Sequence, residues 1–287
     1  MSNLNLLISV NNSYLKKAEI MISSLSINTN EDITVYLLNH SLSEKSVAKF
    51  IKKLKNLKKV TVEIIKVKDS FFDTLPLGEM HFSIEMYYRI IAHYLLPKDL
   101  DRILWLDADI IVMKDLHDFY YQNFDDCFLA ACADSNNSSE EVKQLKSRLG
   151  LAKDYQYFNS GVLLMNLEKI RNQIDLDYII EVSERIKNDL TYPDQDILNC
   201  MFRGKVKYCD WKKFNYQVLR AKSIKQSELD NISILHYSGP WKPWDFHFLN
   251  SASKFYWKYA LKRGYYGEFI FCILKRIAYI VLKRKKS

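Results

Sequence analysis

Cysteine is scarce and unpaired in this chain. The five cysteines among 287 residues form no Cys-x-x-Cys pair; they are Cys127, Cys132, Cys200, Cys209 and Cys272. Neither a disulfide framework nor a zinc site is therefore expected, and buried thiols are typical of a reducing compartment. The first residues also lack the basic and apolar segments of a secretory signal, so the sequence predicts a cytoplasmic protein.

Glycine and proline are also few, at seven and five residues. The chain contains no Gly-x-Gly-x-x-Gly and no Gly-x-x-x-x-Gly-Lys-Ser/Thr, which excludes a Rossmann fingerprint and a P-loop. Because turn-forming residues are so rare, the groups Asn159-Ser160-Gly161 and Ser238-Gly239-Pro240 stand out. We predict that both are turns with a functional purpose.

Excess positive charge is absent from most of the chain. The net charge is +8, and residues 262–287 carry eight Lys/Arg against the single acid Glu268. The remaining residues are therefore nearly neutral, and we do not expect them to bind nucleic acid.

What is present is an alternation of apolar strands and helices. Strands are predicted at 4–10, 33–38, 60–67, 103–106, 128–133, 161–167 and 232–235, and helices at 14–27, 44–57, 83–95, 139–149, 176–186 and 194–202. This order predicts an α/β fold with a mostly parallel central sheet flanked by helices. The length fits one domain over residues 1–250, followed by an appended helical segment over 251–287.

Two aspartates, Asp107 and Asp109, follow the apolar strand 103–106 directly. The carboxyl edge of an open α/β sheet is where ligands bind. Two carboxylates this close disfavour each other's charge unless a cation neutralises them, and their oxygens suit Mg²⁺ or Mn²⁺ holding a diphosphate. Taken alone, such a pair is more often a helix cap or a solvated turn.

Three more segments accompany this strand in a fixed order. Residues 104–109, 157–166, 193–199 and 236–244 together resemble glycosyltransferase family 8, over about residues 4–250. That family includes bacterial lipooligosaccharide galactosyltransferases and glucosyltransferases, and the glycogenins. The resemblance implies a GT-A fold, a single Rossmann-like domain. It also implies that a hexose moves with retention of configuration from UDP-galactose or UDP-glucose to a lipooligosaccharide or another cell-surface or protein-linked glycan.

The resemblance implies a metal site as well. Asp107 and Asp109 would supply oxygens and His236 a nitrogen, a mixed ligand set that favours Mn²⁺, with Mg²⁺ as the alternative. A histidine beside aromatic residues is otherwise more often structural.

Gln195 and Asp194 match the family's catalytic positions. Gln195 would lie near the anomeric carbon, opposite the leaving group, and Asp194 would bind sugar hydroxyls. Because an amide is a feeble nucleophile, we expect front-face attack by the acceptor, with Gln195 stabilising an oxocarbenium-like transition state and no covalent intermediate. A capping role at the helix start would alone explain one of the two carboxylates Asp194 and Asp196.

The resemblance also assigns donor binding to Asn11, Tyr14, Arg89, Asp107, Ala108, Asp134, Asn159, Asp194, Gly239 and Lys242. Asn159 and Asp134 would hydrogen-bond the sugar, and Gly239 allows close backbone approach. Lys242 would meet the diphosphate, although a lone lysine is more often a solvated charge. Arg89 would reach the donor from its helix, and a plain ion pair is the alternative.

The uridine position departs from the family's pattern. Members often carry an aspartate shortly after the first strand to accept the uracil N3–H, whereas this chain has Asn11. The neutral carbonyl of Asn11 can accept the same bond more weakly, which makes uridine selectivity less secure. Tyr14 would stack on the base, or serve as a core aromatic at a helix start.

The C-terminal tail, residues 262–287, has the composition of a second functional segment. Residues 269–282 are apolar apart from Lys275 and Arg276, and a bilayer span needs about 20 apolar residues. On a helix, one face would be apolar, formed by Ile270, Ile273, Leu274, Ile277, Ile280 and Val281, and the basic run 283–286 follows. We predict that residues 262–287 lie on an anionic membrane surface, at the inner face of the cell membrane. The alternative is a terminal helix packed on the body.

Three other functions compete with sugar transfer to a separate acceptor. An apolar strand followed by Asp-x-Asp also resembles a haloacid-dehalogenase-type phosphohydrolase with Asp107 as nucleophile, although here the strand is the fourth and not the first. A glycogenin-like protein would glycosylate one of its own 19 tyrosines. A non-catalytic sugar-binding protein would have lost metal or donor residues, whereas this chain retains them.

Overall fold

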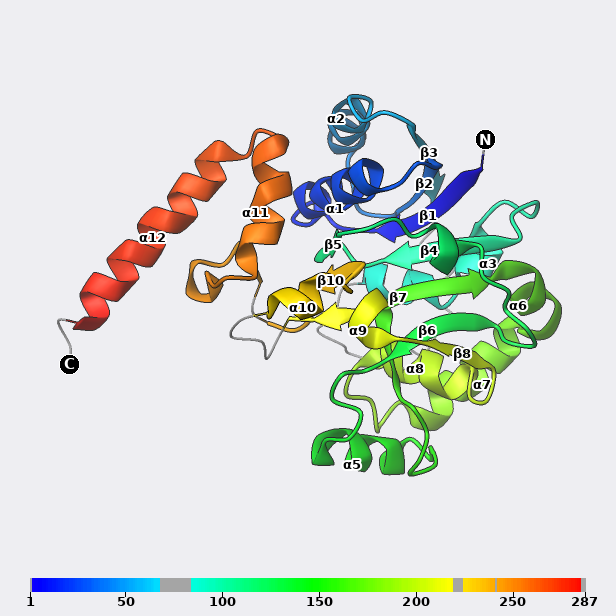
Figure 1. Ribbon diagram of the computed structural model, residues 1–287. Coiled ribbons are helices and arrows are strands. Elements are labelled where there is room, and N and C mark those ends of the chain that lie inside the picture. Colours follow the sequence, from blue (N-terminus) through cyan, green and yellow to red (C-terminus); the bar gives the residue numbers. More distant parts are fainter. Residues whose placement is uncertain (1, 68–83, 219–223, 241, 285–287) are drawn as a thin grey trace.

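The computed structural model describes residues 2–67, 84–218, 224–240 and 242–284 (Figure 1). Residues 83, 241 and 285–287, which belong to predicted segments, lie outside these ranges. The elements up to residue 148 are β1 Asn3–Ser9, α1 Leu15–Asn28, β2 Asp32–Asn39, α2 Glu44–Leu54, β3 Val60–Lys66, the 3₁₀ helix η2 Ile84–Arg89, α3 Ala92–Leu95, β4 Arg102–Leu106, β5 Ile110–Val112, α4 His117–Tyr120, β6 Leu129–Ala133 and α5 Glu140–Arg148. They are followed by β7 Phe158–Asn166, α6 Leu167–Gln173, α7 Leu176–Ile186, α8 Pro193–Met201, β8 Val206–Cys209, α9 Trp211–Phe214, β9 Tyr216–Gln217, α10 Gln226–Leu229, β10 Ile234–His236, the 3₁₀ helix η3 Phe246–Phe248, α11 Ser253–Lys262 and α12 Tyr266–Arg284.

A seven-stranded sheet runs through the centre of the molecule in the order β3-β2-β1-β4-β7-β6-β8. β7 is antiparallel to both of its neighbours, and the other pairings are parallel. The predicted mostly parallel α/β sheet is therefore confirmed. Because β7 runs against the rest, its first residues lie at the edge where β1 and β4 end.

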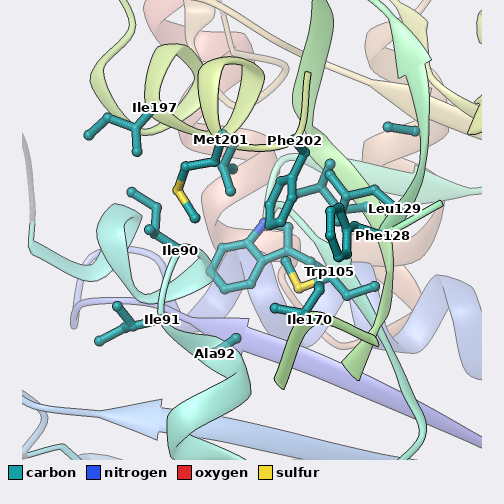
Figure 2. Close-up of a cluster of buried hydrophobic side chains, with 14 of the residues drawn as sticks. Ile90, Ile91, Ala92, Trp105, Phe128, Leu129, Ile170, Ile197, Met201 and Phe202 are labelled. Atoms are coloured by element: carbon teal, nitrogen blue, oxygen red, sulfur yellow. The ribbon is translucent and has the colours of Figure 1, made fainter. Parts of the chain in front are cut away.

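Helices cover both faces of this sheet (Figure 1). Alternate residues of β1, Leu4, Leu6 and Ile8, pack with α1 and α2 in one apolar cluster. Leu7 faces the other way, into the cluster that η2, α3 and α6 to α8 form around Trp105 (Figure 2). The period of two along β1 thus divides the core into two layers.

Side-chain caps fix where several helices begin. Ser43, Ser139 and Asp175 each accept a backbone N–H from the first turn of α2, α5 and α7. Pro193 occupies the first turn of α8, where its missing N–H costs nothing.

The predicted helix 83–95 is wrong as a single helix. The structure has η2 over Ile84–Arg89 and, after a break, one short turn of α3 over Ala92–Leu95. Residues 87–92 are all buried, so this segment has no solvent face. An amphipathic helix needs such a face, and the tighter 3₁₀ turn is used instead.

The predicted turn at residues 159–161 is also wrong. These residues lie in β7, which begins at Phe158, three residues before the predicted start of this strand. Asn159 and Ser160 are polar because their side chains bond to α8, as described below. The second group does contain a turn residue, because Gly239 has a φ of 82°.

A small second sheet, with the order β5-β10-β9, was not predicted. β5 pairs antiparallel with β10, so that His236 lies opposite Ile110. β9 pairs parallel with β10 on the other side. This sheet connects the end of β4 to residues more than 100 positions further along the chain.

The C-terminal helices differ from each other. α11 is packed on the body through Tyr256, Trp257 and Ala260, which share a cluster with Ile20 of α1. α12 packs one face against η3 and α11, where Cys272 is buried and Tyr279 meets Phe246. Its other face leaves Ile270, Phe271, Leu274 and Ile277 more than half exposed, among other apolar side chains, at one side of the molecule (Figure 1). None of the helices in the described ranges combines the length and the hydropathy that crossing a membrane requires.

Candidate active site

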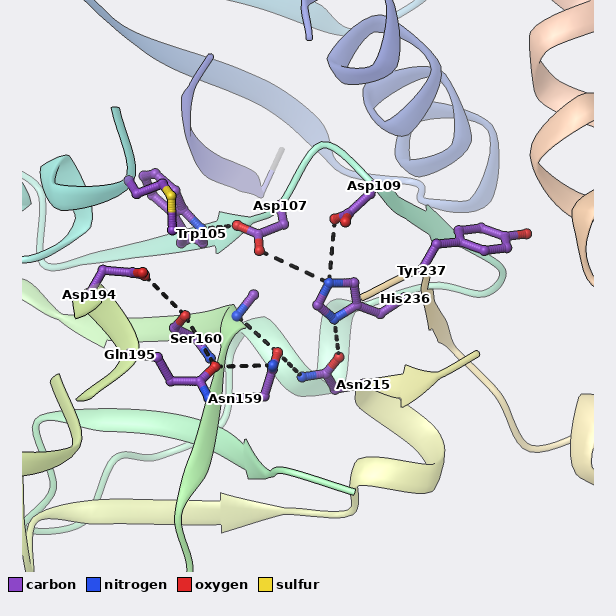
Figure 3. Close-up of polar contacts among 12 residues, drawn as sticks. Trp105, Asp107, Asp109, Asn159, Ser160, Asp194, Gln195, Asn215, His236 and Tyr237 are labelled. Carbon is purple, nitrogen blue, oxygen red and sulfur yellow. Dashed lines mark hydrogen bonds and ion pairs between the residues drawn. The ribbon is translucent and has the colours of Figure 1, made fainter. Parts of the chain in front are cut away.

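The two short strands β5 and β10 bring three predicted metal ligands together. Asp107 and Asp109 lie in the turn between β4 and β5, and His236 ends β10. The Tyr237 N–H donates to the Asp109 carbonyl at 3.0 Å and continues the β5–β10 ladder. One ligand atom from each of Asp107, Asp109 and His236 lies within 4.8 Å of the others (Figure 3).

Asp109 is a buried carboxylate, 8% exposed. Its Oδ2 accepts from the Lys242 ammonium, and its Oδ1 lies 3.3 Å from His236 Nε2. Burial raises the pKa of Asp109, but the charge and the hydrogen bond of Lys242 act against burial, and the pKa lies well below its usual range. In the described part of the chain no group donates a hydrogen bond to Oδ1. An ionised buried oxygen without a donor is costly, and a cation would satisfy it.

Asp107 is held in place by two donors. Its Oδ1 accepts from Trp105 Nε1 at 2.8 Å and lies 3.1 Å from Arg89 Nη2. Its Oδ2 lies 4.0 Å from His236 Nε2. The second oxygen therefore faces the imidazole and Asp109, as a shared cation would require.

Arg89 forms the ion pairs that the sequence left as the alternative to donor binding. The buried guanidinium lies between Asp107 and Asp194, with its Nε 3.2 Å from Asp194 Oδ2, and it stacks 4.3 Å from the centre of the Trp105 ring. Its Nη1 also donates to the Ser160 carbonyl at 2.6 Å. Arg89 thus connects β4, β7 and α8 at one point.

The two aspartates of α8 divide the roles that the sequence left open. Asp196 bonds back to the segment before α8, whose N-cap position is Tyr192: its Oδ2 accepts the N–H groups of Thr191 and Tyr192 at 2.6 and 2.8 Å, and its Oδ1 accepts from Tyr157. Asp194 faces the site. Burial raises the pKa of Asp194, and the charge of Arg89 opposes this rise.

Gln195 lies in a chain of amide hydrogen bonds at the same edge (Figure 3). Its Oε1 accepts from Asn159 Nδ2 at 3.1 Å and from the Ser160 N–H at 2.9 Å. Asn159 in turn accepts from Asn215 Nδ2 at 3.0 Å, and Asn215 Oδ1 lies 2.8 Å from His236 Nδ1. The structure therefore connects the predicted catalytic amide to a predicted metal ligand.

Gly161 provides the space for this arrangement. A Cβ at this position would collide with His236 Cε1 and would lie 2.9 Å from Asp107 Oδ2 and 3.1 Å from Asn159 Oδ1. The purpose that the sequence suggested for this glycine is thus room beside the carboxylates and not a turn.

A cavity of about 330 Å³ opens next to the metal-ligand cluster. Asn11, Tyr14, Arg89 and the residues 107–109, including Ala108, line it together with Glu85 and other residues. The Asn11 Oδ1 accepts from Ser13 N and Oγ at 3.1 and 2.7 Å, so this oxygen is engaged within its own turn. Tyr14 is half-buried and meets the edge of Trp244 at 6.1 Å between ring centres.

Two predicted donor residues lie apart from these contacts. Asp134 follows β6, and its Oδ1 accepts the Asn136 N–H at 2.8 Å. Gly239 lies in the exposed loop between β10 and Lys242. Their roles toward a donor stay predictions.

Sequence reasoning missed Trp105, Ser160 and Asn215 as members of this site. Trp105 read as a core strand residue, and its Nε1 bond to Asp107 has no sequence signal. Ser160 Oγ donates to Asp194 Oδ2 at 3.2 Å. The sequence signal for Asn215 is a polar residue between two aromatic ones, Phe214 and Tyr216. In the structure Asn215 is fully buried, which is unusual for an asparagine.

Comparison with known proteins gives a consistent result. The sequence model of glycosyl transferase family 8 matches residues 5–247. The lipopolysaccharide 1,2-glucosyltransferase of Escherichia coli (strain K12) is 24% identical over 269 residues, which cover 91% of this chain and 78% of that protein. The lipopolysaccharide 1,3-galactosyltransferase of Salmonella typhimurium (strain LT2) is 32% identical over 175 residues, which cover 57% and 50%.

Among solved structures, a crystal structure of the galactosyltransferase LgtC in complex with donor and acceptor sugar analogues is similar to this chain. The TM-score is 0.77 at 25% sequence identity, and the match covers 90% of this chain and 96% of that chain.

Proposed function

Because the chain belongs to glycosyl transferase family 8 and has its GT-A fold, we propose that it transfers a hexose from a UDP-sugar to a glycan acceptor with retention of configuration. The chain is a glycosyltransferase by family. Nucleotide, sugar, stereochemistry and metal are the proposed part. Family membership leaves the phosphohydrolase alternative, with Asp107 as nucleophile, without support.

The observation that carries the proposal is the cluster of Asp107, Asp109 and His236. The donor-free buried Oδ1 of Asp109 faces an imidazole nitrogen, so these residues fit a divalent cation. A nitrogen beside two carboxylates favours Mn²⁺, with Mg²⁺ as the alternative. When bound, such a cation neutralises charge that develops on a departing diphosphate.

The positive charges of the chain support the same leaving group. Lys242 lies against Asp109 and donates to the Tyr237 carbonyl at 2.8 Å, and Arg89 lies against Asp107. Both cations border the residues assigned to the diphosphate, where they would stabilise negative charge in the transition state. The cavity beside Tyr14 and Asn11 would hold the nucleoside.

Gln195 and Asp194 would act on the sugar. Gln195 is held by Asn159 and the Ser160 N–H, which pre-organises the amide and limits its motion. A fixed dipole suits electrostatic stabilisation of an oxocarbenium-like transition state during front-face attack. Asp194, fixed by Arg89 and Ser160, would accept sugar hydroxyls.

UDP-galactose and UDP-glucose are the proposed donors, and a lipooligosaccharide or another surface or protein-linked glycan is the proposed acceptor. The similar proteins support this choice, because their names specify glucosyl and galactosyl transfer to lipopolysaccharide. Intact mass after incubation with the donor would detect self-glycosylation as the alternative.

The test is Mn²⁺-dependent hydrolysis across a panel of UDP-sugars, with Asp109→Asn as the metal-ligand variant. We expect hydrolysis and transfer to fall by at least about 100-fold, because the variant loses the charge that binds the cation. The matched control is Asp126→Asn, whose exposed carboxylate pairs with Lys169 and Lys205 before the start of β6. An unchanged rate in Asp109→Asn would remove the metal from the proposal.

We also propose that α12 holds the enzyme on an anionic membrane, as a peripheral protein of the inner face of the cell membrane. Its exposed side chains Ile270, Leu274 and Ile277 lie one turn apart, and basic residues flank them. An apolar stripe with basic neighbours is the pattern of a helix that lies in the headgroup region. A lipid-linked acceptor would be reached from this position.

Point substitutions test the tail better than its deletion, because Arg263 and Tyr265 at its start bond to the body. The triple variant Ile270→Ser, Leu274→Ser, Ile277→Ser should lose cosedimentation with anionic vesicles and keep its activity on a soluble acceptor. Ile27→Ser, at an exposed apolar position of α1, is the control. Persistent vesicle binding by the triple variant would contradict the assignment.

A further inference from the structure

Asn215 is a fully buried asparagine between α9 and β9 that contacts two parts of the site at once. Its Oδ1 lies 2.8 Å from His236 Nδ1, and its Nδ2 lies 3.0 Å from Asn159 Oδ1. No role has been assigned to it so far. The direction of its hydrogen bonds determines what it does.

A backbone group fixes that direction. The Gly161 N–H, which can only donate, lies 3.0 Å from Asn159 Oδ1, so this atom of Asn159 is the oxygen. The atom of Asn215 that faces the same oxygen must therefore be its NH₂ group. The remaining atom of Asn215, its carbonyl oxygen, then faces His236 Nδ1.

The tautomer of His236 follows from this orientation. A carbonyl oxygen accepts only, so Nδ1 must carry the proton, and in the neutral imidazole the lone pair is on Nε2. Nε2 is the nitrogen that lies 3.3 Å from Asp109 Oδ1 and 4.0 Å from Asp107 Oδ2. A metal-binding histidine needs this arrangement, with its other ring nitrogen held by a hydrogen-bond acceptor.

The same orientation reaches Gln195 at the other end. With its oxygen turned to Gly161 and Asn215, Asn159 presents its NH₂ to Gln195. The Ser160 N–H also donates to the same atom of Gln195, which independently identifies that atom as Oε1. The four side chains His236, Asn215, Asn159 and Gln195 thus have one consistent set of donors and acceptors.

We propose that Asn215 is a positioning residue that holds His236 with its Nε2 lone pair toward Asp107 and Asp109, and that fixes Gln195 through Asn159. This inference rests on the proposed metal-dependent function. Without Asn215, the other tautomer of His236 could donate from Nε2 to Asp109 Oδ1. That hydrogen bond would satisfy the donor-free oxygen and remove a nitrogen ligand.

The first test is Asn215→Leu, a substitution of similar volume without hydrogen bonds. Two-bond ¹H–¹⁵N correlation spectra of ¹⁵N-histidine-labelled protein should show His236 change from the Nδ1-protonated to the Nε2-protonated tautomer. Mn²⁺ binding, measured by electron paramagnetic resonance of the free ion, should weaken about 10- to 100-fold. Both measurements are independent of catalysis.

Asn215→Asp separates the two ends of the chain. A carboxylate still accepts from Nδ1, so the tautomer and the Mn²⁺ affinity should be kept, but it has no proton to donate to Asn159. The second carboxylate oxygen would instead repel Asn159 Oδ1, which the Gly161 N–H still holds, so that Asn159 is displaced from Gln195 and kcat should fall about 10- to 100-fold. This variant decides the question if Asn215→Leu does not fold. An unchanged kcat, or loss of the tautomer, in Asn215→Asp would overturn the proposal.

Asn199→Leu is the matched control. Asn199 is as deeply buried as Asn215, but its side chain bonds to the Phe158 backbone and to the Gln195 carbonyl. Its loss should lower stability without a change in the His236 tautomer or in Mn²⁺ affinity. Wild-type protein that binds no Mn²⁺ would contradict the proposed metal site. A wild type that binds Mn²⁺, together with an Asn215→Leu variant of equal affinity and the same tautomer, would contradict only the role of Asn215.

Discussion

Two buried carboxylates, Asp109 in the candidate active site and Glu19 in α1, face cations in different ways. Both Glu19 oxygens have donors: Arg263 Nε lies 2.8 Å from Oε1, Lys53 Nζ lies 3.0 Å from Oε2, and the Tyr265 hydroxyl also donates to Oε2. In Asp109 only Oδ2 has a described donor, Lys242, and Oδ1 has none.

The number of oxygens that have donors indicates whether a buried carboxylate serves stability or function. Around Glu19, donors from the protein to both oxygens oppose the desolvation cost of the charge, and the contacts join α1 and α2 to Arg263 and Tyr265, between α11 and α12. At Asp109 part of the cost is left for a ligand to offset, as is typical of functional sites. We therefore expect changes at Glu19 to affect folding and changes around Asp109 to affect metal binding and catalysis.

The largest expected effect on stability is that of Glu19→Gln. The variant leaves Arg263 and Lys53 facing a neutral amide, and loss of one partner of a buried ion pair costs about 4 kcal/mol of unfolding free energy. Urea unfolding followed by circular dichroism measures it. Activity toward a soluble acceptor should be unchanged under conditions where the variant is folded.

The control for this change is Glu268→Gln. Glu268 pairs with Lys16 at 2.6 Å on the surface, and both side chains are about half exposed. Exposed pairs contribute less than about 1 kcal/mol. Equal stability losses in Glu268→Gln and Glu19→Gln would contradict the contrast between the regions.

Asp196 of α8 resembles Glu19, because both of its oxygens accept hydrogen bonds from the protein, and we expect it to serve stability as well. Burial raises the pKa of Asp196 to about 6, against the bonds from Tyr157, Thr191 and Tyr192 that lower it. A raised pKa means that the contribution of this group to stability is complete below about pH 4 and is lost as the pH rises through 6.

Asp196→Asn should reveal this dependence. The unfolding free energy of the wild type, minus that of the variant, should fall by about 3 kcal/mol between about pH 4 and pH 7. The control Asp126→Asn should give a flat difference in this range, because Lys169 and Lys205 hold the pKa of Asp126 at about 2. A flat difference for Asp196→Asn would show that its buried carboxyl is already ionised at pH 4.

Local patterns predicted most of the fold. The strands β1, β2 and β3 and the helices α2 and α7 lie within a few residues of their predicted bounds, because alternation and capping are local signals. The strand end alone indicated Asp107 and Asp109 as metal-ligand candidates, whereas His236 came only from the family resemblance. These three residues come together only because β5 pairs with β10. A short apolar run such as 110–112 does not predict which strand it pairs with.

The remaining features depend on tertiary contacts. Asn159 and Ser160 looked like a turn because both are polar, yet their partners Gln195 and Asp194 lie more than 30 positions away. The only local signal of Asn215 is its polarity between two aromatic residues, and its role appears only when the Gly161 N–H fixes the direction of the amides. Propensity is overridden where a strand must carry polar groups to a site.

Gly161→Ala gives the smallest of these effects. It tests most directly whether the carboxylates of the candidate active site serve metal binding and not stability, because the backbone of Gly161 does not require glycine, whereas the atoms around it leave no room for a Cβ. The added Cβ would meet His236 and Asp107, so Mn²⁺ affinity should weaken by about 100-fold, equivalent to about 2.7 kcal/mol.

The control Gly204→Ala has the opposite character, because Gly204 has a φ of 77° and nothing lies within 4 Å of its added Cβ. It should lose about 1 kcal/mol of stability through backbone strain and retain full Mn²⁺ affinity. Electron paramagnetic resonance titration and urea unfolding of both variants would show whether space beside the carboxylates serves the metal, and an unimpaired affinity in Gly161→Ala would show that the cation is held elsewhere.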